Sequence, residues 1–132
     1  MPTITRWFIK ASLISLTLGL SAGIWGQTAN AAGIFPVYLH LLTFGWLTQL
    51  IFGVALWMFP IYSKEQPRGP EWLVWGIFAA LNLGLLLRVV FEPLQSLSPT
   101  TLGNRALVAA AVLQWLSGVG FAAAVWNRIR RK

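Results

Sequence analysis

The stretch PVYLHLLTFGWLTQLIFGVALWMF, residues 36–59, contains no aspartate, glutamate, lysine or arginine. A transmembrane helix needs roughly 20 predominantly apolar residues, and this stretch is long enough to form one. Three further apolar segments of similar length lie at residues 7–25, 72–91 and 104–126. Glycine and proline punctuate the connections between them, which is typical of turns. The sequence therefore predicts an all-α membrane protein with a single domain, residues 1–132, whose four transmembrane helices form an antiparallel up-down bundle.

The composition supports this fold class and excludes several others. Hydrophobic residues make up 57% of the chain and charged residues only 10%, whereas a soluble protein of this size needs a larger charged surface. Cysteine is absent, which excludes disulfides, thiolate metal ligands, iron–sulfur clusters and covalently attached c-type haem. The sequence shows no nucleophile–histidine–acid set and no phosphate-binding glycine loop, so it gives no support to soluble catalysis.

The distribution of lysine and arginine predicts the orientation, because cytoplasmic loops carry an excess of these residues. Arg88 and Arg105 lie on one side of the predicted membrane. The others lie on the opposite side: Arg6, Lys10, Lys64, Arg68, Arg128, Arg130, Arg131 and Lys132. Both termini are therefore expected to be cytoplasmic, in a bacterial inner membrane. This placement explains the net charge of +7 without nucleic acid, and the tail RIRRK, residues 128–132, is interpreted as a juxtamembrane anchor for anionic lipid.

The first segment also has features of a signal peptide. Arg6 and Lys10 precede an apolar run, and TANA, residues 28–31, is similar to a cleavage site with small residues. We expect the segment to be retained as the first transmembrane helix. Cleavage would leave three spans.

His40 is the only histidine of the chain, and it lies about 6 Å along the predicted second helix from Pro36. Arg88 and Glu92, at the end of the third helix, are expected at a similar depth, and their i,i+4 spacing allows them to pair. Ionisable residues inside a membrane are costly and usually face protein or a cavity, which makes them candidates for function. Two interpretations of His40 stay open, a metal or haem ligand and a structural residue. For Arg88 the alternatives are contact with a bound anionic group and extension to the headgroups.

A mononuclear metal site needs more ligands than this chain provides, whereas one axial histidine suffices for haem. A mostly apolar stripe follows His40 on the same face of its helix: Thr43, Phe44, Leu47, Ile51 and Val54. Three interpretations of this stripe stay open, namely a lipid face, a helix seam and the wall of a haem pocket.

Polar and aromatic residues within the other spans predict how the helices pack. Asn82 and Gln114 are expected to bond between helices. Trp46 and Trp115 lie near mid-span and are expected to face protein or a ligand. Small residues and Gln114 recur every four residues along the fourth span and predict a helix–helix face: Ala106, Ala110, Gln114, Gly118 and Ala122.

The segment HLLTFGWLTQLIFGVALWMFP, residues 40–60, resembles small four-helix relatives of subunit I of haem–copper oxidases and nitric oxide reductases. The resemblance continues through LNLGLLLRVVFEPL, residues 81–94. The first and fourth helices match only in hydropathy.

This resemblance implies a site and an assembly. The large subunit I has twelve helices in three arcs of four, and a histidine near the outer end of the second helix ligates a low-spin haem. The matching residue is His40. Arginines near the outer surface engage haem propionates in that family, and Arg88 matches them by depth. A four-helix chain corresponds to one arc, which implies a homotrimer with haem b between adjacent protomers and a second axial ligand, if any, from another chain.

Two features of that family are missing. Its copper site needs three histidines and a cross-linked tyrosine, and this chain has one histidine, so no copper is expected. The carboxylates of its proton channels have no counterpart among Glu65, Glu71 and Glu92. Proton-pumping oxygen reduction is therefore not expected.

Three functions follow, in decreasing order of support. The first is a haem-b-binding membrane protein in electron transfer or in binding of a diatomic gas such as NO or O2, with a respiratory-chain partner. The second is a cofactor-free structural or assembly subunit of a membrane complex. The third is a small transporter, which ranks last because no carboxylate is expected at mid-span. Whether the chain is an enzyme stays open.

Overall fold

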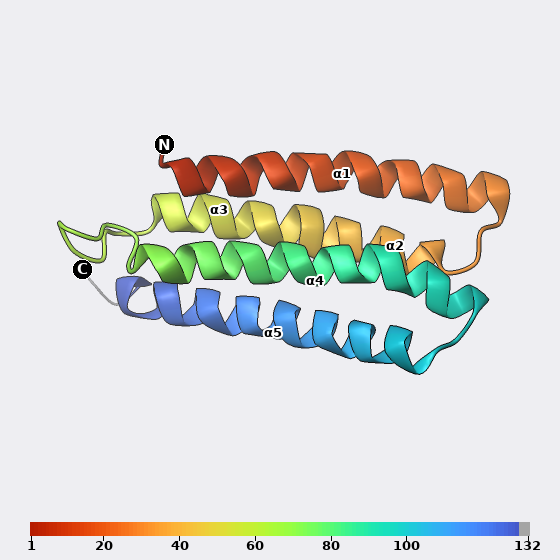
Figure 1. Cartoon of the computed structure of the whole chain (residues 1–132). Coiled ribbons are helices and arrows are strands. Elements are labelled where there is room, and N and C mark those ends of the chain that lie inside the picture. The colour runs from red at the N-terminus through yellow and green to blue at the C-terminus, as the bar shows by residue number, and fades with distance from the viewer. Residues whose placement is uncertain (130–132) are drawn as a thin grey trace.

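The computed structural model describes residues 1–129, which are helical apart from the connections (Figure 1). The helical elements are α1 (Thr3–Ala29), α2 (Ile34–His40), the π-helix η1 (Leu41–Thr48), α3 (Gln49–Met58), α4 (Glu71–Leu97) and α5 (Thr101–Ile129). The elements α2, η1 and α3 follow one another without a break. The prediction of an all-helical chain with four long apolar segments is confirmed over the described residues.

The four segments lie side by side, and successive segments run back and forth between two ends of the bundle (Figure 1). The N-terminus, the connection between α3 and α4, and the end of α5 lie at one end, which we term the terminal end. The other two connections lie at the opposite end, which we term the distal end. This arrangement brings residues far apart in sequence to a common level.

Each segment is long enough and apolar enough to cross a bilayer. The segments contain 27, 25, 27 and 29 residues, and at about 1.5 Å per residue each exceeds the roughly 30 Å of a hydrocarbon core. Only 22–33% of each apolar window is buried inside the chain. The remaining apolar side chains face outward, as lipid-facing helices require.

Helix α1 packs closely on the second segment because small residues face each other. A Cβ atom placed on Gly53 would lie 2.7 Å from Cβ of Phe8, and one placed on Gly45 would lie 2.7 Å from Cβ of Ser15. Small residues allow such close approach, which supplies much of the packing energy between membrane helices.

Helices α4 and α5 form the other closely packed pair. A Cβ atom on Gly84 would lie 2.9 Å from the carbonyl oxygen of Ala110. Most buried residues of α5 are spaced three, four or seven residues apart, although Ala124 and Val125 are adjacent: Gly103, Ala110, Gln114, Ser117, Ala124, Val125 and Arg128. The predicted four-residue stripe is therefore correct at Ala110 and Gln114 but wrong at Gly118 and Ala122, which are exposed. Four residues turn an α-helix about 40° beyond one full turn, so a strict four-residue stripe leaves the contact face.

An apolar cluster joins the two helix pairs toward the terminal end. It contains Phe8 of α1, Leu56 of α3, Ile77 of α4 and Val125 of α5, all buried. The rings of Phe52 and Phe121 are stacked with centroids 3.9 Å apart.

All four helical segments are longer than predicted, and the C-terminal ends of α1 and α4 extend into residues expected to form connections. Helix α1 continues to Ala29, and Asn30 ends it with a φ of 46°, a left-handed conformation that asparagine tolerates. Helix α4 continues through Pro93 to Leu97, so the predicted connection at residues 92–103 is mostly helical. Proline removes one backbone donor but is tolerated in membrane helices whose neighbours support the chain. Glu92 therefore lies inside a helix rather than in a loop.

Candidate functional site

His40 lies at the C-terminal residue of α2, in the distal half of the bundle. Its Nδ1 atom lies 2.8 Å from the carbonyl oxygen of Pro36 and 3.3 Å from Oε1 of Glu92. The side chain is 23% exposed, and its ring lies nearly parallel to that of Phe44. Because Nδ1 is engaged, Nε2 is the ring nitrogen that remains for another ligand.

Glu92 brings the two predicted site residues together. Its Oε1 accepts a hydrogen bond of 2.9 Å from Nη1 of Arg88 and also faces His40. Nε of Arg88 donates to Oε1 of Gln114 over 3.1 Å. We term these four residues the distal polar cluster. It links α2, α4 and α5, so the prediction that His40 and Arg88 share one level is confirmed, as is the pairing of Arg88 with Glu92.

The charges of the distal polar cluster compensate one another. Glu92 is 8% exposed, Arg88 is 18% exposed, and the two charges sum to zero when His40 is neutral. Buried ion pairs persist where geometry and hydrogen bonds offset the loss of hydration. Glu92 Oε2 has no hydrogen-bond partner among the described residues. The i,i+4 spacing of Arg88 and Glu92 predicts only the pairing of these two residues. It gives no sign of the contact between Glu92 and His40.

A π-helix begins directly after His40 and extends over Leu41–Thr48. Its i→i+5 hydrogen bonds place more residues in each turn than an α-helix does, and such segments often occur at functional sites. Nothing in the hydrophobic pattern of this stretch predicted it. The buried residues of the π-helix are Leu41 and Gly45, which are four residues apart. Gln49, four residues after Gly45, is also buried.

The apolar stripe that follows His40 points mostly away from the bundle. Thr43 is exposed, and the side chains of Leu47 and Ile51 are 48% and 52% exposed. Thr43, Leu47 and Ile51 therefore do not form a seam within the chain, whereas Phe44 is half-buried and packs against buried residues of the bundle. The exposed residues of the stripe and the partly exposed imidazole face the outside of the bundle.

Two other predictions concern residues inside the spans. Asn82 accepts a hydrogen bond of 3.3 Å from Nε2 of Gln49, which confirms that it bonds between helices. Trp46 is half-buried, whereas Trp115 is 65% exposed and does not face protein within this chain.

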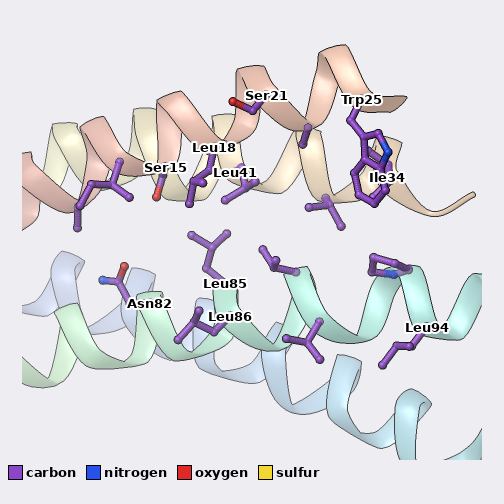
Figure 2. Close-up of a pocket in the computed structure, with 17 residues that line it drawn as sticks. Ser15, Leu18, Ser21, Trp25, Ile34, Leu41, Asn82, Leu85, Leu86 and Leu94 are labelled. Carbon is purple, nitrogen blue, oxygen red and sulfur yellow. The ribbon is translucent and has the colours of Figure 1, made fainter. Parts of the chain in front are cut away.

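An apolar groove runs between α1 and α4, floored by α2 and η1, with a volume of about 900 Å³. Figure 2 shows Ser15 and Asn82 at one end of the groove and Trp25 near the other, with leucine side chains between them. Neither His40 nor Arg88 lines it. The groove and the distal polar cluster are therefore separate features.

The contacts of His40 fit a single axial haem ligand, and His40 does not line the apolar groove. A backbone carbonyl or carboxylate on Nδ1 is the usual support for a metal-ligating imidazole, because it orients the ring and raises its basicity. Among residues 1–129 no group of three or more histidine, cysteine, aspartate or glutamate side chains could hold a metal ion. Arg88 already binds Glu92 and Gln114 through Nη1 and Nε, which leaves Nη2 for a further acceptor.

Comparison with protein-family models, with curated proteins and with solved structures gives no match.

Proposed function

We propose that the chain is an integral membrane protein that binds haem b through His40 and acts in electron transfer or in binding a diatomic gas. The observation that carries this proposal is the orientation of the imidazole. Nδ1 is held at 2.8 Å by the carbonyl oxygen of Pro36, and Nε2 is left on a partly exposed face of the bundle. This arrangement of an imidazole supports ligation through Nε2.

The bound haem would supply an iron centre whose ligation decides between one-electron transfer and gas binding. Pro36 and Glu92 orient His40, and Arg88 holds Glu92 in place. The remaining donor of Arg88, Nη2, is the group available to a haem propionate. No copper site is proposed, since the chain has one histidine.

The assembly proposed for this function is a homotrimer. The exposed stripe beside His40 supplies an apolar surface that a neighbouring protomer would cover, with the haem between the two. The resemblance to one arc of a twelve-helix subunit favours three copies. A mass measurement of the detergent-solubilised protein, corrected for bound detergent, tests this number.

Optical spectra of the purified protein test the haem proposal. We expect a Soret band and a dithionite-reduced spectrum of b type from the wild type in mild detergent. His40→Asn is the most informative variant, because the asparagine amide can replace the donor at Nδ1 but offers nothing at the position of Nε2. We expect this variant to keep its stability and to lose or alter the haem spectrum. Thr43→Ala, on the same exposed face, is the matched control and should keep the spectrum.

A wild type that stays colourless after haem supplementation during expression would contradict the proposal. So would a His40→Asn spectrum identical to that of the wild type. Addition of CO to the reduced protein separates the two activities, because an open axial position gives a shifted Soret band and a position closed by a second protein ligand does not.

A second candidate function is a cofactor-free structural or assembly subunit of a membrane complex, for example beside a respiratory enzyme. The distal polar cluster favours it, since every residue of the cluster is also explained by bonding between α2, α4 and α5. This function predicts a colourless protein whose stability, rather than its spectrum, depends on His40.

The proposed orientation places both termini in the cytoplasm of a bacterial inner membrane. Arg6, Lys64, Arg68 and Arg128 lie at the terminal end, which supports it by the positive-inside rule. Residues 130–132 of the basic tail lie outside the described residues. The chain has no cysteine, so Lys64→Cys and Thr100→Cys introduce unique thiols. An impermeant maleimide added to intact cells should label only the second.

A further inference from the structure

Arg128 is a buried arginine at the terminal end, outside the distal polar cluster. It is 1% exposed. Its Nη2 donates to the carbonyl oxygens of Leu56 and Phe59 over 3.0 and 2.8 Å, and its Nε donates to that of Pro60 over 2.7 Å. Its Nη1 atom is buried and has no hydrogen-bond partner among the described residues.

Arg68 belongs to the connection between α3 and α4, in which Pro60 accepts a hydrogen bond from Arg128, and it adds a second positive charge at this end of the bundle. The two charges lie near enough to repel each other. The Nε atom of Arg68 is also buried and without a hydrogen-bond partner in the described part of the chain. Two guanidinium groups, each with a buried donor that has no partner among residues 1–129, therefore belong to the same end of the bundle.

The connection between α3 and α4 holds Arg68 in this place. The backbone N–H of Tyr62 donates to the carbonyl oxygen of Pro67 over 2.8 Å, and that of Gln66 donates to Oγ of Ser63 over 2.9 Å. The connection is thus folded back on itself. These bonds position the backbone next to Arg68, whose side chain is half-buried.

Among residues 1–129 no carboxylate forms a salt bridge with either arginine. Glu65 lies in the same connection and Glu71 begins α4 next to it. The salt bridges within residues 1–129 are nevertheless those of Glu92 at the opposite end. A buried donor without a partner costs about 1–3 kcal/mol, and more when it is charged. An oxygen-rich anion is the kind of ligand that satisfies both arginines at once, because planar guanidinium groups match phosphate geometry.

Exposed tryptophans mark the membrane level of this pair. Trp57, Trp72 and Trp126 are 49%, 76% and 65% exposed, and they lie near the ends of α3, α4 and α5 next to the arginines. Tryptophan is enriched at the level of lipid headgroups. The arginine pair is therefore placed where phosphates of the bilayer occur.

We propose that Arg68 and Arg128 form a binding site for a phosphate group, supplied by the headgroup of an anionic lipid. Basic pockets between transmembrane helices bind such headgroups. The phosphate joins the α3–α4 connection to the end of α5, and it neutralises the repulsion between the two arginines. This site is independent of haem and of the distal polar cluster.

The test measures binding of short-chain lipids to the full chain in a mild detergent. The probes are dioctanoyl-phosphatidylglycerol, dioctanoylglycerol without phosphate, and inorganic phosphate, each followed by tryptophan fluorescence. Arg68→Gln is the test variant, because Arg128 also holds backbone carbonyls and its removal would perturb the fold. Arg105→Gln is the control, an exposed arginine at the distal end.

We expect phosphatidylglycerol to bind the wild type and the control with the same Kd, dioctanoylglycerol to bind neither, and Arg68→Gln to weaken binding about fivefold or more. Binding of inorganic phosphate with equal affinity would support the phosphate site and identify the free anion as its source. Absence of binding by both phosphates, or an unchanged Kd in Arg68→Gln, would overturn the proposal.

A second measurement distinguishes this role from a structural one. Without added phosphate Arg68 only repels Arg128, so Arg68→Gln should be as stable as the wild type or more stable. With phosphatidylglycerol the wild type should gain more stability than the variant. A loss of stability in Arg68→Gln that is independent of the lipid would contradict the site.

Discussion

Replacement of Arg128 by methionine tests how the end of α3 is stabilised. The carbonyl oxygen of Leu56 would accept a hydrogen bond from residue 60 in a continuing helix, but that residue is a proline and has no N–H. Leu56 is fully buried, so water does not replace the missing donor. Arg128 does so from α5, seventy-two positions along the chain. Methionine retains much of the apolar stem and removes the donors.

The expected loss follows from the three carbonyl groups. Leaving the buried carbonyl of Leu56 without a partner costs about 1–3 kcal/mol. Those of Phe59 and Pro60 belong to a half-buried and an exposed residue, so water can replace part of their bonds, and each should contribute about 0.5–1 kcal/mol. The variant also loses the repulsion between Arg128 and Arg68 and the cost of burying the guanidinium. We expect a net loss of about 2–3 kcal/mol.

Equilibrium unfolding in mixed micelles, followed by tryptophan fluorescence and far-ultraviolet circular dichroism, measures this loss. Arg105→Met is the matched control on the same helix, because Arg105 is exposed and its replacement should change stability by no more than about 0.5 kcal/mol. If Arg128→Met loses no more stability than the control, the three hydrogen bonds do not stabilise the end of α3 and the reasoning is refuted.

Three further substitutions test the packing and the distal polar cluster by the same unfolding assay. Gly53→Ala should lower the free energy of unfolding by about 1–3 kcal/mol, because the new Cβ would lie 2.7 Å from Cβ of Phe8. Gly76→Ala is the control and should be neutral or stabilising, because its Cβ would meet nothing within 4 Å. Equal effects of the two substitutions would contradict the close packing. Gly33→Ala should lose more stability than Gly69→Ala. Both glycines have a positive φ, but only a Cβ atom at Gly33 would crowd the backbone of α4, at 2.8 Å from Cα of Pro93. A larger loss of stability at Gly69 would refute that contact. Glu92→Gln should lower the free energy of unfolding by about 2–3 kcal/mol. Breaking a fully buried ion pair costs roughly 3–5 kcal/mol, and the loss is smaller here because Arg88 is 18% exposed. A loss below about 0.5 kcal/mol would show that the ion pair contributes little to stability.

The number of helices was predictable from the sequence because apolar length alone decides it. The four segments of the structure contain the four predicted spans apart from Phe59, which follows α3. Helix ends were less predictable. Pro93 and Asn30 are both residue types that favour the end of a helix, yet α4 continues through Pro93 whereas α1 ends at Asn30. Only the surrounding helices determine whether the helix continues. The π-helix was not predictable, because its hydrogen bonds leave no mark on the hydrophobic pattern. Within the π-helix, Gly45 packs closely on Ser15 of α1.

The candidate site was predictable in part. Depth along each helix placed His40 and Arg88 at one level, and i,i+4 spacing predicted the pair of Arg88 and Glu92. The contact between His40 and Glu92 depends on the rotation of α2 relative to α4, which periodicity does not give. Arg128 was assigned to a basic tail, yet it is buried. The sequence signal was present, because a proline after an apolar helix leaves a carbonyl unsatisfied, but the donor lies on a helix that only the fold brings near.

The two ends of the bundle bury arginine under opposite electrostatic conditions. At the distal end Arg88 is neutralised by Glu92, so the site can be covered by lipid or by another protomer at little electrostatic cost. At the terminal end the partners of Arg128 within residues 1–129 are carbonyl dipoles at the C-terminus of α3, and Arg68 adds a second positive charge. A site of this second kind is stable where anions are available, at the headgroups and not in the hydrocarbon. The same asymmetry that supports the proposed orientation by the positive-inside rule therefore also separates a neutral cluster suited to an interface from a cationic pair suited to a phosphate.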